Sequence, residues 1–181
     1  MENTPVCNVI IIGGASAGYT AAIYLGRATL APLLLAGENA GGQLMYTDIV
    51  ENYPGFPEGV LGPELITKCK KQAKKFGTKF MDGNVESFSA KPGNVYEIVV
   101  DGEKVEALTV IIATGATARR LDVPGTGDGE FWQKGVTACA VCDGAMPIFR
   151  EKHLYVIGGG DTAVEEAVFL TKFGSKVFIV H

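Results

Sequence analysis

The chain of 181 residues has no excess of positive charge, little histidine and no long apolar run. It carries 16 Lys and Arg against 20 Asp and Glu, which gives a net charge of −4 at pH 7. Proteins that bind nucleic acid or an anionic membrane surface generally show a basic balance, so we expect neither partner. The longest apolar runs have four or five residues, whereas a membrane-spanning helix needs roughly 20.

Cysteine is scarce, and a signal for export is missing from the start of the sequence. Residues 1–7 contain Glu2 and no basic residue, which is unlike a secretory signal or a transit peptide. Four cysteines in a small secreted protein would suggest a disulfide framework. Here 47% of the residues are hydrophobic and 20% are charged, so a packed core needs no such framework. We therefore expect a reducing compartment, the cytoplasm, and one redox-active pair.

Glycine, in contrast, is abundant, with 24 residues that mark tight turns rather than a collagen repeat. An apolar strand over 8–12 is followed by a glycine turn at 13–18, a helix to about residue 30 and a strand over 33–36. This order predicts a βαβ unit with parallel strands. The same order recurs near the end of the chain, in a strand over 154–157, a glycine turn over 158–160, a helix over 162–173 and a strand over 176–180.

The region between the two βαβ units changes its hydrophobic period. Residues 37–62, rich in Gly, Pro, Asn and Tyr, predict an ordered loop, and Pro63 predicts the first turn of a helix over 63–76. Strands are expected at 85–88, 96–100 and 105–108 as an antiparallel meander, followed by a buried strand over 109–113. The fold class is therefore α/β: a Rossmann-like βαβ unit with an antiparallel β-meander, then the start of a second Rossmann-like domain. We expect domains over 1–116 and 117–181.

The second glycine turn matches the dinucleotide-binding pattern G-x-G-x-x-G/A from Gly158 to Ala163. Gly158 permits the tight turn, Gly160 lets the backbone approach a pyrophosphate at the helix N-terminus, and Ala163 permits close helix–strand packing. The strand context favours nucleotide binding over a merely structural turn. No acidic residue ends the following strand, at Val180-His181, and this is compatible with a 2′-phosphate and hence with NADPH over NADH.

The first glycine turn departs from the pattern. Gly13 and Gly18 are in place, but Ala15 occupies the position of the middle glycine, where a methyl group would crowd the path of a pyrophosphate. An acidic residue about 20 positions further on would bind ribose hydroxyls. Glu38 lies close to that place, and it can equally be a surface carboxylate.

The motif Cys139-Ala140-Val141-Cys142-Asp143-Gly144 is the chemical centre of the sequence. Two intervening residues allow a pair of cysteines to close a disulfide or to share a metal. Zinc normally needs two further ligands, and neither the other two cysteines nor the two histidines have ligand spacing, so we expect no metal site. A redox pair is favoured over paired structural cysteines. Asp143 can hold or deliver a proton, or cap the turn before Gly144. We expect Cys7 and Cys69 to be small buried residues.

Taken in order, these motifs resemble the low-molecular-weight thioredoxin reductases, a family of flavoproteins with two nucleotide-binding domains. The resemblance runs over essentially the whole chain. The matching segments are Ile11-Ile12-Gly13, Ala17-Gly18-Tyr19-Thr20-Ala21-Ala22, Gly41-Gly42-Gln43-Leu44, Glu51-Asn52-Tyr53-Pro54-Gly55-Phe56, Ala113-Thr114-Gly115-Ala116, the Cys139–Gly144 motif, and Gly158-Gly159-Gly160-Asp161-Thr162-Ala163-Val164-Glu165-Glu166-Ala167.

The resemblance implies that residues 1–116 bind FAD and that residues 117–181 bind NADPH and carry the redox pair. It implies an oxidoreductase in which electrons pass from NADPH through FAD to the Cys139–Cys142 disulfide and on to thioredoxin, with Asp143 as the acid–base partner. Relatives are homodimers that pair through their FAD domains. The implied FAD-binding residues are Gly13, Ala15, Ser16, Ala17, Gly37, Glu38, Gly41, Gly42, Gln43, Asn52, Val85, Ala113, Thr114 and Gly115. The implied NADPH-binding residues are Gly158, Gly160, Asp161 and Thr162.

Three features depart from the family pattern. Ala15 replaces a glycine, Val141 stands where threonine is common, and relatives continue beyond His181 to complete both domains. The chain is therefore expected to be a truncated form of an NADPH-dependent thioredoxin-disulfide reductase. Two alternatives stay open at this point: a flavin-dependent oxidase of small dithiols, and an inactive truncated fragment that binds nucleotide.

Overall fold

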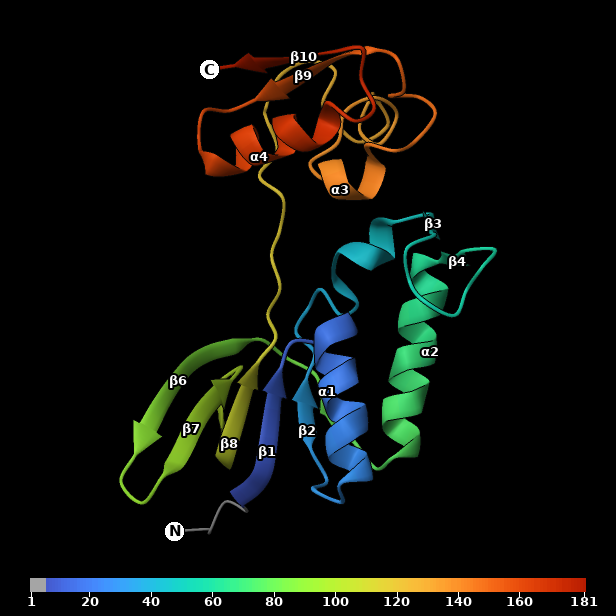
Figure 1. Ribbon diagram of the computed structural model, residues 1–181. Coiled ribbons are helices and arrows are strands. Elements are labelled where there is room, and N and C mark those ends of the chain that lie inside the picture. The colour runs from blue at the N-terminus through green and yellow to red at the C-terminus, as the bar shows by residue number, and fades with distance from the viewer. Residues whose placement is uncertain (1–5) are drawn as a thin grey trace. The chain divides into compact units, whose positions relative to one another are not determined.

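The structure is a computed structural model that describes residues 6–181. The chain divides into two compact units, the first ending at Thr117 and the second running from Ala118 to His181. The mixed α/β fold expected from the sequence is confirmed in both (Figure 1). Among the described residues, no helix has the length and apolarity needed to cross a membrane.

The first unit is built on a six-stranded sheet with the strand order β5-β2-β1-β8-β7-β6. β1 is parallel to both of its neighbours, β2 and β8, and β2 is parallel to β5. The other half of the sheet, β8-β7-β6, is antiparallel, as the meander predicted. The strands are β1 (Val6–Ile12), β2 (Leu33–Leu35), β5 (Lys79–Met81), β6 (Val85–Lys91), β7 (Val95–Val100) and β8 (Glu103–Ile112).

Helices cover one face of this sheet. α1 (Ser16–Arg27) and α2 (Gly62–Lys75) lie side by side in Figure 1. Pro63 sits in the first turn of α2, as predicted. The segment expected to be an ordered loop contains a short 3₁₀ helix, η1 (Gly42–Tyr46), and a small antiparallel pair, β3 (Ile49–Val50) and β4 (Val60–Leu61).

β8 joins the two halves of the sheet. The sequence predicted two strands here, over 105–108 and 109–113, whereas the structure has one continuous strand of ten residues. Its first part pairs antiparallel with β7, from Glu103 to Ala107, and its later part pairs parallel with β1, up to Ile112. No residue breaks the strand between Leu108 and Thr109; the pairing with β1 begins at Glu106, and the pairing with β7 ends at Ala107.

The core of the first unit lies on both faces of the sheet because successive side chains of a strand point to opposite faces. Val9 and Ile11 of β1 join one apolar cluster with residues of α1 and α2. Ile10 and Ile12 join the other cluster with Ile98 of β7. Each face of β1 is therefore buried against a different part of the unit.

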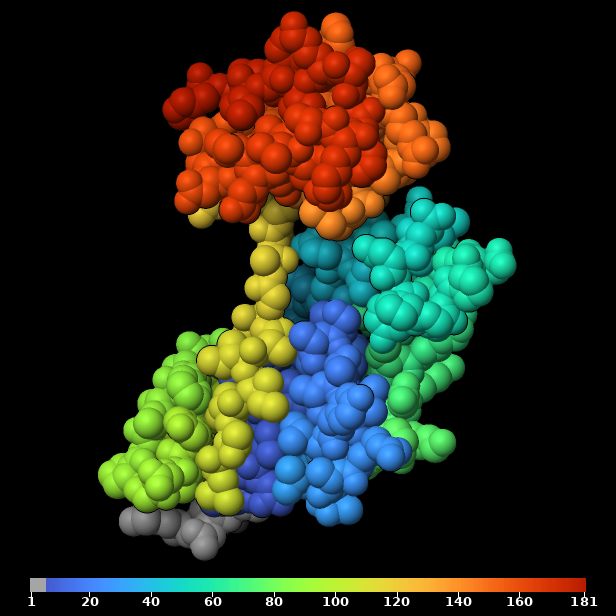
Figure 2. Space-filling view, in the orientation of Figure 1, coloured from blue at the N-terminus to red at the C-terminus, as the bar shows by residue number. Residues whose placement is uncertain are grey.

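The second unit contains the predicted second βαβ arrangement. β9 (His153–Ile157) and β10 (Lys176–Val180) are parallel, and α4 (Asp161–Leu170) connects them. A short helix, α3 (Ala140–Asp143), holds the cysteine motif. Of the apolar side chains described in this unit, only Ala140, Leu154 and Ala167 are buried. Half of the large apolar side chains of β9, β10 and α4 are exposed, namely Tyr155, Ile157, Val164, Val168, Ile179 and Val180. Residues 160–181 form the orange-red to red surface of Figure 2.

Candidate functional site

The first glycine turn connects β1 to α1. Gly13 has a φ of +119°, and its N–H donates to the Leu35 carbonyl oxygen of β2 at 2.8 Å. A Cβ atom at Gly13 would lie 2.1 Å from the Ala113 carbonyl oxygen, and one at Gly18 would lie 1.8 Å from the Gly13 carbonyl oxygen. Because these are backbone contacts, both glycines are required by the packing of the protein itself.

Ala15, the departure from the expected pattern, lies at the N-cap position of α1. Its methyl group faces the start of η1, because a Cβ atom at Gly42 would lie only 3.1 Å from the Ala15 Cβ. The N–H of Gly41 donates to the Gly14 carbonyl oxygen at 2.6 Å and fastens this segment to the turn. The structure thus places the methyl group beside Gly42, within the set of residues expected to bind FAD.

Most of the residues expected at the FAD site follow strands that run in the same direction. The carboxyl ends of parallel strands lie at one edge of a sheet, and this edge is where α/β folds bind ligands. Residues 13–17 follow β1, residues 37–38 follow β2 and residues 113–115 follow β8. The fold therefore brings these three groups to one edge of the sheet, and the loop at 41–43 joins them through the Gly41 hydrogen bond.

Two of the expected residues lie apart from this group. Asn52 is exposed, in the connection between β3 and β4, and lines a shallow hollow with its neighbours from Glu51 to Pro57. Val85 begins β6, where it packs against the second core cluster.

Asn84, which sequence reasoning did not identify, braces the turn at Glu38. Its side-chain Oδ1 accepts a hydrogen bond from the Glu38 N–H at 3.0 Å. Its own N–H donates to Asp101 Oδ1, and its carbonyl oxygen accepts from the Asp101 N–H, each at 3.2 Å. The backbone of Glu38 is thereby held by a residue 46 positions away. The only sign of this role in the sequence was an Asn after a glycine, which is typical of a turn and does not reveal that its side chain bonds the Glu38 backbone.

The redox motif lies in the second unit. Cys139 and Cys142 form a disulfide, with their Cα atoms 5.3 Å apart. Cys139 is half-buried and Cys142 is exposed. The N–H of Cys142 donates to Cys139 Sγ at 3.2 Å, and the N–H of Asp143 donates to the Cys139 carbonyl oxygen at 3.1 Å. The backbone of α3 therefore donates one hydrogen bond to the sulfur of the first cysteine and one to its carbonyl oxygen.

Asp143 has a second partner that sequence reasoning missed. The Thr137 hydroxyl donates to Asp143 Oδ2, and the Cys139 N–H donates to the same hydroxyl oxygen at 3.2 Å. Both Thr137 and Asp143 are half-buried. A threonine two residues before the first cysteine was visible in the sequence, but it could not be distinguished from any other turn residue.

The two remaining cysteines lie in the first unit, apart from the disulfide. Cys69, on α2, is 8% exposed, and burial raises the pKa of its thiol. Its burial agrees with the expectation that it is a small core residue. Cys7, on β1, is half-buried rather than buried.

The second glycine turn has room beside it. Gly158 has a φ of +141°, and a Cβ atom there would lie 3.3 Å from the Ala163 methyl group, so these residues pack closely as the pattern predicted. Gly160, in contrast, has an ordinary extended backbone, with φ −90° and ψ 176°. A Cβ atom at Gly160 would meet no atom within 4 Å.

Neither backbone conformation nor packing among the described residues requires glycine at position 160. The residue precedes α4, whose first N–H groups can bind an anion. A pyrophosphate can approach the backbone closely only where no side chain occupies the space beside it, and a Cβ atom at Gly160 would partly fill that space. Asp161 and Thr162, the other residues expected to contact NADPH, form the exposed first turn of α4 beside it.

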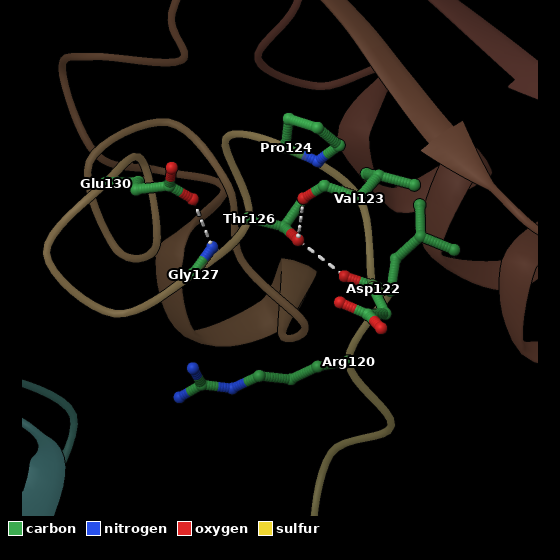
Figure 3. Close-up of a pocket in the computed structure, with 8 residues that line it drawn as sticks. Arg120, Asp122, Val123, Pro124, Thr126, Gly127 and Glu130 are labelled. Carbon is green, nitrogen blue, oxygen red and sulfur yellow. Dashed lines mark hydrogen bonds between the residues drawn. The ribbon is translucent and has the colours of Figure 1, made fainter.

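A further hollow, lined by residues between Arg120 and Glu130, begins the second unit (Figure 3). Its polar groups are bonded to one another. Glu130 Oε2 accepts from the N–H groups of Gly125 and Gly127 at 3.0 and 2.9 Å, and the Thr126 hydroxyl donates to carbonyl oxygens of the same loop. The Arg120 guanidinium pairs with Asp128. The loop that lines the hollow therefore uses these polar groups for its own hydrogen bonds and ion pair.

Known proteins that resemble this chain are oxidoreductases that act on disulfides, in agreement with the disulfide and the glycine turns described above. The family model described as pyridine nucleotide-disulphide oxidoreductase matches residues 7–181. Thioredoxin reductase of Chlamydia trachomatis is 56% identical over 178 residues, covering 96% of this chain and 56% of the relative. The protein named thioredoxin reductase 1, mitochondrial, of Arabidopsis thaliana is 53% identical over 189 residues, covering 99% of this chain and 49% of the relative.

Solved structures give the same result. The crystal structure of thioredoxin reductase from Streptococcus pyogenes has a TM-score of 0.85 and 41% sequence identity, covering 99% of this chain and 56% of that one. The chain spans about half the length of the curated relatives it matches. The match of the family model over nearly every residue decides the family: the chain belongs to the pyridine nucleotide-disulphide oxidoreductases.

Proposed function

We propose that this chain carries the redox centre and both nucleotide-binding turns of a thioredoxin-disulfide reductase, in which electrons pass from NADPH through FAD to Cys139–Cys142 and on to thioredoxin. The observation that supports this most directly is the disulfide between Cys139 and Cys142 in the same unit as the open turn at Gly160. The names of the relatives from Chlamydia and Arabidopsis support the same activity.

Membership of the family implies flavin and nicotinamide nucleotide as cofactors. We assign FAD to residues 1–116, where the ends of β1, β2 and β8 present Gly13, Glu38 and Thr114 at one sheet edge. We assign NADPH to residues 117–181, with its pyrophosphate at Gly160 and the first turn of α4. When bound, the nicotinamide would supply a hydride, and the flavin would accept it and pass its two electrons to the disulfide, releasing the proton.

The cysteine pair then transfers that electron pair to the substrate. One thiolate attacks a sulfur of the substrate disulfide and forms a mixed disulfide, and the substrate's other sulfur leaves as a thiolate. The second cysteine of the pair attacks the mixed disulfide, which restores Cys139–Cys142 and releases the substrate as a dithiol. Asp143 supplies the proton that the leaving sulfur takes up and recovers it from the second cysteine.

The first test is the visible absorption spectrum of the purified 181-residue chain after incubation with FAD. We expect a bound-flavin spectrum that NADPH bleaches in the absence of oxygen, and thiol formation when oxidised thioredoxin is added. A bound flavin that NADPH leaves oxidised would favour an oxidase of small dithiols. A protein that remains colourless would contradict FAD binding by this chain and favour a nucleotide-binding fragment without reductase activity.

The remaining parts of the proposal concern assembly and location. We propose a homodimer that pairs through the FAD-binding unit, which analytical ultracentrifugation of the FAD-loaded chain would test. We also propose a cytoplasmic location, while the name of one Arabidopsis relative indicates mitochondria for that protein. Fractionation of cells that express the chain would distinguish the two compartments.

A further inference from the structure

Thr137 lies at the centre of a short chain of hydrogen bonds beside the disulfide. Its hydroxyl oxygen accepts from the Cys139 N–H at 3.2 Å, and its proton is donated to Asp143 Oδ2. The Asp143 N–H in turn donates to the Cys139 carbonyl oxygen at 3.1 Å. The three residues therefore form a closed loop of hydrogen bonds around the first cysteine.

The direction of these hydrogen bonds follows from the chemistry of the groups. A hydroxyl has one proton, and an amide N–H can only donate. Because the Cys139 N–H uses one of the hydroxyl's lone pairs, the hydroxyl proton is free to point at the carboxylate, which accepts. A hydrogen bond to a carboxylate is stronger than one between neutral groups. The side-chain torsions of Asp143 are thus tied to the backbone of Cys139.

We propose that Thr137 is a positioning residue for the redox pair, whose hydroxyl holds the Asp143 carboxylate in a fixed orientation beside the disulfide. One oxygen, Oδ2, is committed to Thr137, and Oδ1 lies outside this loop of hydrogen bonds. The inference rests on the proposed dithiol–disulfide function of the pair. It adds a residue to that function that neither the cysteine motif nor its aspartate identifies.

The chemical step that depends on this orientation is the opening of the disulfide by a dithiol. The attacking thiol forms a bond to one cysteine sulfur, and the S–S bond breaks. Asp143 first takes up the proton of the attacking thiol, and the other cysteine sulfur, which leaves with the electron pair of the S–S bond, then receives that proton from Asp143. The second thiol of the reductant repeats the exchange, so that the products are two protein thiols and one oxidised reductant. A carboxylate that rotates freely performs this proton transfer less often.

The test measures how fast dithiothreitol opens the Cys139–Cys142 disulfide in the 181-residue chain, by acid quenching, alkylation and mass. T137V replaces the hydroxyl with a methyl group of the same shape, and we expect it to slow the opening about tenfold, less than the roughly hundredfold that a positioned acid or base typically contributes. T137S restores the hydroxyl and is expected to stay within about twofold of the wild-type rate. T171V is the matched control, because the Thr171 hydroxyl donates only to the Val168 carbonyl oxygen of α4.

A double-mutant cycle separates positioning from a general effect on the turn. We expect D143N to slow the opening and T137V to add nothing in the D143N background, because the hydroxyl acts through the carboxylate. If T137V misfolds, T137A takes its place, because it removes the hydroxyl without introducing a branched apolar group. We expect T137A to slow disulfide opening as much as T137V. Equal rates for wild type and the folded hydroxyl-free variant, or equal slowing with and without Asp143, would overturn the proposal.

The assay contains neither FAD nor NADPH, so a failure to bind cofactors does not affect it. A wild-type disulfide that dithiothreitol does not open would contradict the proposed function of the pair, and with it the role of Thr137. A disulfide that opens at the same rate in every Thr137 variant would contradict the role of Thr137 alone.

Discussion

The two compact units each contain a strand, a glycine turn and a helix, but the physical reason for having glycine at these positions differs between them. In the first unit, a Cβ atom at Gly13 or Gly18 would collide with backbone atoms of the chain itself. In the second unit, a Cβ atom at Gly160 would meet nothing within 4 Å. The same motif thus contains glycines that packing requires and one that packing does not explain. The latter is the better indicator of a ligand.

The cores of the two units differ as well. β1 lies between β2 and β8 and has a cluster of buried side chains on each face. β9 and β10 form a sheet of two strands, in which Leu154 is the one buried apolar residue among those described. Local stability follows the number of buried apolar contacts, so the first unit is expected to be much the more stable of the two.

Hydrogen exchange would test this difference in stability directly, and it should show the largest effect. We expect the amides of Ile10 and Ile11 to exchange about a thousandfold more slowly, or more, than those of Phe178 and Ile179, because β10 opens without disrupting a core. The measurement is native-state exchange of the 181-residue chain read by NMR. Similar protection of β1 and β10 would show that the second unit is stabilised by contacts other than the ones described.

Substitution of Gly18 would test whether packing requires the first turn. We expect G18A to lower the free energy of unfolding by about 3 kcal/mol, since the added methyl group overpacks the turn against the Gly13 carbonyl oxygen. Urea unfolding followed by circular dichroism gives this value. A loss below about 1 kcal/mol would mean that the turn relaxes around the methyl group.

Substitution of Gly160 is the matched experiment in the second unit. We expect G160A to leave the free energy of unfolding unchanged or to raise it by up to about 1 kcal/mol, because the extended backbone suits alanine and the unfolded chain loses freedom. The same change is expected to weaken NADPH binding about tenfold, as seen by calorimetric titration, since the methyl group occupies the place of the pyrophosphate. Unchanged affinity would remove the argument that Gly160 faces the nucleotide.

The smallest expected effect concerns the ion pairs of the meander, where Lys91 contacts Glu97 and Glu106 and where Lys104 lies 3.4 Å from Glu97. The hydrogen bond from Lys91 lowers the pKa of Glu97 below its ordinary 4.5. The stabilisation is therefore fully present above pH 4.5 and is lost as the pH falls through the lower, folded-state value. E97Q should be slightly less stable than wild type at pH 7 and equal to it in strong acid.

The control for this prediction is E103Q, since Glu103 lies on the same sheet outside the group of ion pairs. Its difference from wild type should not follow the same pH dependence. Chemical unfolding at a series of pH values gives both curves. A difference between E97Q and wild type that persists in acid would contradict the assignment to the Lys91–Glu97 pair.

The βαβ units were predictable because their signals are local. Short apolar runs, glycine turns and small residues on the helix lie within a few positions of one another, and Pro63 marks the start of α2. β8 was wrongly divided because the place where its pairing with β7 ends and only its pairing with β1 continues leaves no trace in the strand's own residues. The brief strands β3, β4 and β5 have two or three residues each, too few to show a period.

The placement of the candidate-site residues in the fold was predictable to the same extent. The cysteine pair, Asp143 and the glycines lie in short motifs, whereas Asn84 reaches Glu38 across 46 residues only once β2 and β6 are in place. Thr137 lies close to the cysteines in sequence, but its role depends on the direction of one hydroxyl. Periodicity and motif spacing carry no information about such contacts.

The continuity of β8 has a mechanical consequence. This strand pairs with β7 along its first part and with β1 along its later part, and the chain leaves it through 113–117 towards the second unit. Tension applied through that connection pulls along the axis of β8. The hydrogen bonds between β8 and β1 are then loaded in shear, so that many must break together and cannot open one after another. The first unit should therefore resist a pulling force applied where the two units are joined, and β9 and β10 should unfold first.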